Sequence, residues 1–175
     1  KTIDAARLYA EDSIGNQMPA KGKHKVLTWR EARTVWAVAE TMFPAGGKLK
    51  TTIEEAEVVT YVDNLLASMQ LKERILVRCL FTLFEVQLLV TQPTSPKRFS
   101  KASLEERTSS LVQWDKSSLH MQRVAFQALR SIILWAYVDN PTVAREIGVE
   151  PGIDVIARQQ IKHAVRGTRT ASAAK

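Results

Sequence analysis

The stretch ILVRCLFTLFEVQLLV, residues 75–90, is apolar except at Arg78, Thr82, Glu85 and Gln87. A single membrane span needs about 20 predominantly apolar residues, and a charged residue near the bilayer centre costs about 2.5–3.5 kcal/mol. These 16 residues are too few and carry two charges. A helix that is apolar nearly all round suits the centre of a helical bundle instead. We therefore predict that residues 75–90 form a central helix surrounded on every side.

One face of this helix can pack in the core of the chain while another face binds a partner protein. The residues expected in the core are Leu76, Leu80 and Leu83. The residues expected beneath a partner protein are Phe81, Phe84 and Leu88. Arg78 and Glu85 are two helical turns apart and share a face. They either pair through a neighbouring helix or lie at an edge that another subunit covers, so we include both in the predicted partner-binding set.

Helical periodicity extends over the rest of the chain. Apolar residues recur at helical spacing in residues 27–44, 51–70, 98–114 and 119–140. Three helix starts carry the capping-box pattern, with Thr28 and Glu31, Thr52 and Glu55, and Ser103 and Glu106. In residues 119–140 the stripe expected to face inward consists of Val124, Ala128, Leu129, Ile132, Trp135 and Ala136. Alternating strand patterns are missing, so we predict an all-α fold, a compact bundle of about five or six helices.

Charge is distributed unevenly along the chain, which has a formal net charge of +7. Residues 31–157 carry 14 basic and 15 acidic side chains, whereas residues 158–175 carry five basic and none acidic. We predict a polar N-terminal arm over 1–26, a helical bundle domain over 27–152 and a basic amphipathic C-terminal helix and tail over 153–175. The basic arms are expected to reach across a partner through Arg158, Lys162, Arg166 and Arg169. A neutral body argues against a folded nucleic-acid-binding face.

Motifs for catalysis are missing. The sequence has no phosphate-binding glycine loop, no nucleophile elbow and no zinc-protease motif. The acidic pairs occur in first helical turns, where they offset the helix dipole. Cys79 is the one cysteine, and we expect it to be a small core residue. We therefore predict no catalytic, cofactor-binding or metal-binding residues and no enzymatic activity for the chain by itself.

The second half of the chain resembles a helical region that accompanies flavin-dependent GMC-type oxidoreductases. This region is the N-terminal extension of long-chain alcohol oxidases and the separate small subunit of bacterial dehydrogenases of the gluconate 2-dehydrogenase subunit 3 type. The residues that carry the resemblance are Arg98-Phe99-Ser100 before L-E-E-R, Trp114, Trp135, Asn140-Pro141 and Ile147-Gly148. The first half is similar in layout, so the resemblance covers about residues 27–152. Where relatives continue with Gly-Tyr-x-Gly-Pro, this chain has Gly148 followed by V-E-P-G.

The resemblance implies a non-catalytic accessory subunit that stabilises or assembles a large GMC-type catalytic subunit and shapes access to its substrate site. FAD is then expected in that partner, and this chain holds no cofactor. The implied complex oxidises an alcohol, sugar or sterol. Trp114, Asn140 and Pro141 join the predicted partner-binding residues.

The sequence leaves the localisation of the protein and one alternative function open. The chain is expected to be soluble or peripherally membrane-associated through its complex, in the cytoplasm or exported with its partner. The alternative is a stand-alone helical adaptor or regulator whose basic ends bind nucleic acid or an anionic membrane. Binding to nucleic acid would be steeply salt-dependent, because it releases counterions.

Overall fold

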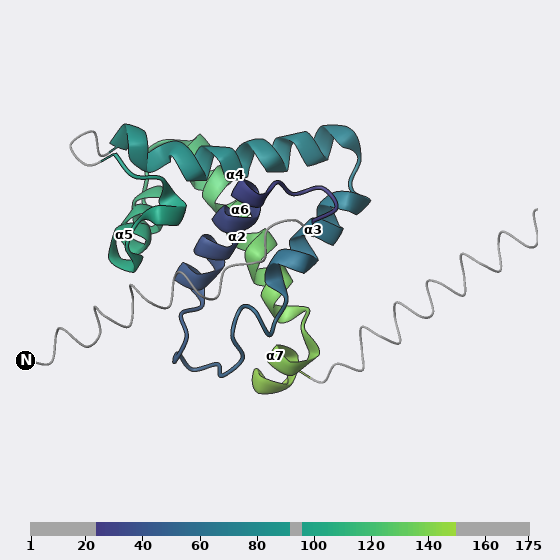
Figure 1. Ribbon diagram of the computed structural model, residues 1–175. Coiled ribbons are helices and arrows are strands. Elements are labelled where there is room, and N and C mark those ends of the chain that lie inside the picture. The colour runs from purple at the N-terminus through teal and green to yellow at the C-terminus, as the bar shows by residue number, and fades with distance from the viewer. Residues whose placement is uncertain (1–23, 92–95, 150–175) are drawn as a thin grey trace, which may run out of the picture.

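The computed structural model describes residues 24–91 and 96–149. In these residues all regular secondary structure is helical (Figure 1). The elements are α2 (Trp29–Met42), α3 (Val58–Ser68), α4 (Leu71–Thr91), the 3₁₀ turn η1 (Phe99–Lys101), α5 (Leu104–Asp115), α6 (His120–Val138) and α7 (Pro141–Glu146). The predicted all-α bundle of about five or six helices is confirmed for this part of the chain. The predicted C-terminal helix and tail, and nearly all of the predicted N-terminal arm, lie outside the described residues.

Helix α2 occupies the centre of the bundle. It packs against α3, α4, η1, α5 and α6, and in Figure 1 it lies beneath α4 and between α5 and α3. Residues 34–39, the sequence TVWAVA, are all buried, so the helix is covered on every side. The prediction that residues 75–90 form the central helix is wrong. Helix α2 buries residues all round, including Ala32, Ala37 and Ala39, whereas α4 leaves one side exposed, so α2 is the central element.

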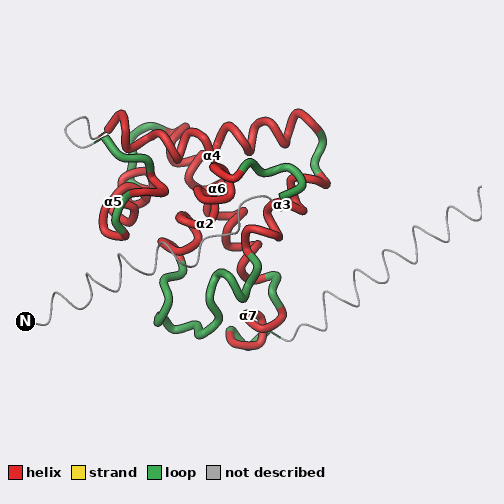
Figure 2. Tube along the Cα trace, viewed as in Figure 1, coloured by secondary structure: helices red, strands yellow, loops and turns green. Residues whose placement is uncertain are grey.

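Helix α4 lies across the top of the bundle (Figure 2). Its buried residues are Phe81, Phe84, Gln87 and Leu88, whereas Leu76 and Leu83 are exposed. The predicted assignment of the two faces is therefore reversed. The aromatic side chains fill the core, where the rings of Phe84 and Trp114 lie 4.4 Å apart. Phe81 and Phe84 are fully buried within the chain, so they leave no bare surface for a partner.

Two of the three predicted capping boxes begin helices as expected. Thr28 caps α2 and Ser103 caps α5, each with the reciprocal hydrogen bonds to the glutamate at the third helical position. The box of Thr52 and Glu55 also forms its hydrogen bonds, but α3 begins only at Val58.

Glu57 ends the first turn after Thr52. Its φ of 53° places it in the left-handed region, which normally favours glycine. The amide of Val58 donates to the carbonyl of Ile53, and that of Glu57 donates to the carbonyl of Glu54. This is the hydrogen-bond pattern that closes a helix C-terminus. The chain thus makes one helical turn, breaks and starts again as α3.

Two other sequence predictions about burial are wrong. Cys79 is exposed on α4 rather than buried in the core. On α6, Leu129 and Ala136 are buried as expected, but Val124, Ala128 and Trp135 are exposed, Trp135 to 68%. The helix instead buries Phe126, Ile133 and Tyr137. Both stripes of α6 are apolar at helical spacing, so periodicity alone could not choose between them.

Candidate functional site

An exposed apolar stripe runs along α4 and is the main candidate for a functional surface. We call it the α4 face; its residues are Leu76, Cys79, Leu83, Val86 and Val90. Their spacing alternates between three and four residues, which places them on one side of a helix. The four aliphatic members are 37% to 78% exposed. The exposed positions from 75 to 90 also include Ile75, Thr82 and Leu89, so between positions 75 and 90 the outer side of α4 carries no charge. The exposed Lys72, four residues before Leu76, lies at the N-terminal end of the stripe.

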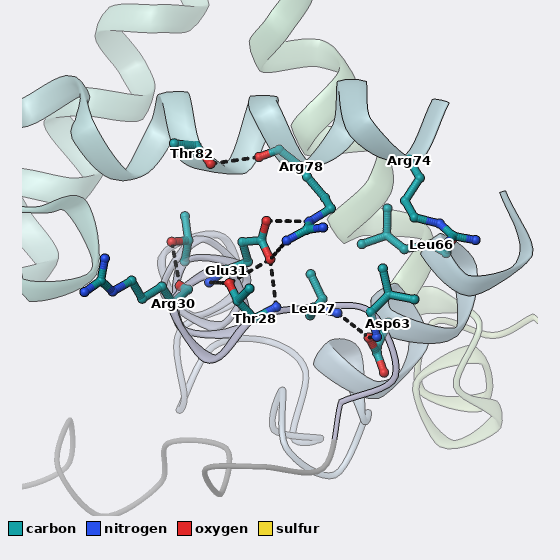
Figure 3. Close-up of polar contacts among 11 residues, drawn as sticks. Leu27, Thr28, Arg30, Glu31, Asp63, Leu66, Arg74, Arg78 and Thr82 are labelled. Atoms are coloured by element: carbon teal, nitrogen blue, oxygen red, sulfur yellow. Dashed lines mark hydrogen bonds and ion pairs between the residues drawn. The ribbon is translucent and has the colours of Figure 1, made fainter. Parts of the chain in front are cut away.

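Arg78 fastens α4 to the start of α2. Its Nε donates to Glu31 Oε1 at 2.8 Å, and its Nη2 donates to Oε2 at 3.2 Å. Figure 3 shows Glu31 between Arg78 and Thr28, whose backbone and hydroxyl groups also donate to the carboxylate. Burial raises the pKa of Glu31, but the hydrogen bonds from Arg78 and Thr28 outweigh burial and hold the pKa below its usual value. Glu31 therefore stays charged and keeps Arg78 on the inner side of α4.

Glu85 makes a second polar attachment, two turns further along α4. Its carboxylate accepts hydrogen bonds from the Thr34 hydroxyl at 3.0 Å and from the backbone and hydroxyl of Ser100 at 3.1 and 2.7 Å. Thr34 belongs to α2, and Ser100 belongs to η1. Arg78 and Glu85 thus both attach to neighbouring elements, as one of the two sequence-based alternatives proposed. Because both charges point inward, the rotation of α4 is fixed and the apolar side faces outward.

Asp63 anchors the segment that leads into α2. Its carboxylate accepts hydrogen bonds from three successive backbone amides, those of Lys25, Val26 and Leu27, at 2.6, 2.9 and 2.8 Å; Figure 3 includes the bond from Leu27. Sequence reasoning did not select Asp63. The one available signal was an acidic residue in the otherwise apolar pattern of α3.

The predicted partner-binding residues do not form one surface. Phe81, Phe84, Leu88 and Trp114 lie in the core. Asn140 begins α7, where its side chain accepts from the Thr142 amide and donates to the Glu55 carbonyl at 3.1 Å. Pro141 follows it at the first helical position and is exposed. The predicted residues of the C-terminal tail, Arg158, Lys162, Arg166 and Arg169, lie outside the described residues.

The remaining surface offers shallow recesses. One of them has a volume of about 530 Å³ and lies along α6, next to Val124 and Ala128. Across residues 24–91 and 96–149, no three His, Cys, Asp or Glu side chains gather as metal ligands would. Over the same residues, every helix is too short or too polar to pass through a lipid bilayer.

A family model described as gluconate 2-dehydrogenase subunit 3 matches residues 30–152. The chain belongs to the gluconate 2-dehydrogenase subunit 3 family. The match runs from the first turn of α2 to beyond α7, so the subunit 3 family accounts for the whole described bundle. No curated protein and no solved structure matches the chain. The resemblance to the gluconate 2-dehydrogenase subunit 3 type that the sequence indicated is therefore confirmed.

Membership of the subunit 3 family indicates an accessory subunit of a dehydrogenase complex, which associates with a catalytic subunit in a hetero-oligomer. It also places catalysis in another chain. A surface that binds a protein is thus the relevant kind of site in this family. Within the described residues the α4 face is one exposed, uncharged helix surface, and the stripe of Met121, Val124, Ala128, Ser131 and Trp135 on α6 is another; the α4 face consists of aliphatic side chains and Cys79, whereas the α6 stripe includes a serine.

Proposed function

We propose that the chain is the non-catalytic small subunit of an FAD-dependent, GMC-type oxidoreductase and that the α4 face docks its catalytic subunit. The substrate of the complex is an alcohol, a sugar or a sterol. FAD and the catalytic base belong to the large partner. Family membership supports the accessory role, and the likeness of residues 98–152 to the helical region of GMC-type oxidoreductases supports the type of partner.

The α4 face is the observation that carries this proposal. The large exposed apolar patches of soluble proteins are often binding sites, particularly when polar residues border them. Burying an aliphatic side chain fully contributes about 1.5–3 kcal/mol, and Leu76 and Val90 are each more than 70% exposed. A partner that covers them therefore gains several kilocalories per mole from the hydrophobic effect.

Docking on this face gives the accessory subunit a stabilising role. A catalytic subunit that presents a complementary apolar surface is prone to aggregate when it is alone. Binding that favours the folded state stabilises that state by mass action. The small subunit thus supports folding and assembly of the complex, and by covering one side of the catalytic subunit it shapes access to the substrate site.

A matched pair of variants tests the docking surface. Leu76 on α4 and Met121 on α6 are exposed to 72% and 75%, so replacing either with glutamate perturbs the folded monomer little. We expect Leu76→Glu to lose at least tenfold in affinity for the FAD-containing catalytic subunit in co-expression and titration, and Met121→Glu to bind like the wild type. Circular dichroism checks that both variants fold.

Two results contradict the proposal. If Leu76→Glu binds the catalytic subunit as tightly as the wild type, the α4 face is not the docking surface. A wild-type chain that purifies as a colourless monomer with no affinity for a co-expressed GMC flavoprotein overturns the accessory function itself.

A further inference from the structure

Four cationic side chains gather in one recess of the bundle. They are Arg30 and Arg33 of α2, Arg98 immediately before η1, and Lys101 within η1. We call these four residues the basic cluster. The recess has a volume of about 270 Å³, and one carboxylate, that of Glu85, also lines it. The cluster unites residues from two separate segments of the chain, so the fold creates it.

The basic cluster lacks acidic partners. Among residues 24–91 and 96–149, the ion pairs join Arg78 to Glu31, Lys97 to Glu106 and Arg107 to Glu40. Glu85 already accepts hydrogen bonds from Thr34 and Ser100. The bundle as a whole is nearly neutral, so four unpaired cations in one recess are a local excess of charge.

Arg33 is the most constrained member of the basic cluster. Its guanidinium lies 4.7 Å from the centre of the Trp29 ring. Its Nε is shielded from solvent and has no hydrogen-bond acceptor. Stacking on an aromatic ring holds a guanidinium in a fixed orientation. The cluster therefore presents at least one pre-oriented guanidinium.

The basic cluster borders the α4 face. A second recess, of about 230 Å³, is lined by Arg30 and Arg98 together with Thr82 and Val86 of α4. Val86 is itself part of the α4 face. Arg30 points away from the Arg78–Glu31 ion pair, as Figure 3 shows. A protein that covers the C-terminal half of the α4 face thus reaches the cluster as well.

The size of the α4 face also requires a larger contact. From Leu76 to Val90 the α4 face is about 22 Å long, and a strip about 10 Å wide along it offers roughly 220 Å². Stable protein–protein interfaces bury about 800 Å² on each partner. The partner must therefore cover surface beside the stripe, and the basic cluster is the adjoining surface with unsatisfied charge.

We infer that the basic cluster binds aspartate or glutamate side chains of the catalytic subunit that docks on the α4 face. This inference rests on the function proposed above. Arginine matches carboxylates through paired N–H donors, and three of the four residues are arginine. Complementary charges beside an apolar contact set the orientation of docking and accelerate association.

Two double variants with the same change in charge test this inference. Arg98→Gln with Lys101→Gln removes two exposed cations of the basic cluster. Lys116→Gln with Arg130→Gln removes two exposed cations outside it. Affinity for the purified catalytic subunit is measured for both, and for the wild type, at low and high salt. We expect the cluster variant to bind about tenfold more weakly at low salt and to show a flatter salt dependence, and the control to follow the wild type.

Three outcomes would overturn the inference, and they differ in what they say about the proposed function. If the wild type binds the catalytic subunit and both double variants bind equally well, the cluster does not bind it, while the proposed function stands. If the wild type does not bind at all, the proposed function fails together with this inference. If only the cluster variant loses binding to phosphatidylserine vesicles while keeping its affinity for the catalytic subunit, the cluster binds lipid headgroups instead.

Discussion

The guanidinium of Arg107 lies 2.7 Å from the carboxylate of Glu40 and joins α5 to the central helix. Arg107 is only 1% exposed, and it also donates to the carbonyl of Ala37 at 3.0 Å. Glu40 keeps 22% of its side chain in contact with solvent. The buried charge of Arg107 therefore needs Glu40 as its counter-ion, whereas the carboxylate of Glu40 can be hydrated by solvent.

Removing Glu40 should cost more stability than removing Arg107. Glu40→Ala leaves a buried cation without its counter-ion, which costs about 3–5 kcal/mol in buried pairs. Arg107→Met replaces the cation with an apolar side chain of similar length, and Glu40 can then turn to solvent. We expect the urea midpoint of Glu40→Ala to be the lower of the two. Equal midpoints would show that the charge of Arg107 is tolerated without Glu40.

Asp63 should make the stability of the fold depend on pH in the acid range. Burial raises its pKa, but the hydrogen bonds from the amides of Leu27, Lys25 and Val26 outweigh burial and lower the pKa below its usual value. Because the folded state prefers the charged form, the contribution of Asp63 is complete above the ordinary aspartate pKa of about 3.9 and is lost as the pH falls through the folded-state pKa.

We therefore expect Asp63→Asn to lower the free energy of unfolding by about 2 kcal/mol at pH 7. The difference from the wild type should shrink as the pH falls below 4, as measured by urea unfolding at a series of pH values. Asp115→Asn, at an exposed position at the end of α5, is the matched control. A difference for Asp63→Asn that is constant from pH 7 to pH 2 contradicts the role of the carboxylate charge.

Replacing Glu57 with glycine should stabilise the chain. The left-handed conformation costs a residue with a Cβ about 1–2 kcal/mol, and glycine adopts it freely, although glycine also loses more entropy on folding. We expect a net gain of about 0.5–1 kcal/mol for Glu57→Gly in thermal and urea unfolding. Glu73→Gly, in the first turn of α4, should instead lose about 1 kcal/mol. Loss of stability in both variants would contradict the strain assigned to Glu57.

Cys79 should report on the docking of the catalytic subunit. It is exposed within the α4 face and is the one cysteine of the sequence, so a maleimide modifies one defined site. We expect fast modification in the isolated chain and strong protection in the complex. For a control, a Cys79→Ser chain carrying Met121→Cys should react equally fast in both states. Protection of position 121 rather than 79 would move the interface to α6.

Local sequence signals predicted the helix starts better than they predicted burial. The boxes at Thr28 and Ser103 depend on residues three positions apart, so the sequence contains the whole interaction. The break at Glu57 has no such signal, because an acidic residue takes the conformation that glycine usually takes. Its cause lies in the contacts that hold α3 and the preceding turn, such as the bond from Trp36 Nε1 to Glu54 at 2.7 Å.

The inward face of α4 could not be predicted from α4 alone. Both of its faces are apolar, and the choice between them depends on Glu31, Thr34 and Ser100, which lie elsewhere in the chain. Attachment of Arg78 and Glu85 to a neighbouring helix was one of two alternatives that the sequence left open. The sequence of α4 did not show that this attachment would turn Phe81 inward and Leu83 outward. The basic cluster could not be predicted from the sequence either, because its four residues come from two separate segments that only the fold brings together.

The exposed apolar stripe of α4 affects the lifetime of the subunit in the cell as well as its place in the complex. Protein quality control recognises exposed apolar segments, and chaperones and proteases continuously remove proteins that present them. We therefore expect a surplus copy of this subunit to be short-lived and its abundance to follow that of the catalytic subunit. A pulse-chase measurement should find Leu76→Glu longer-lived than the wild type when no partner is expressed; an equal half-life would mean that the stripe does not mark orphan copies for removal.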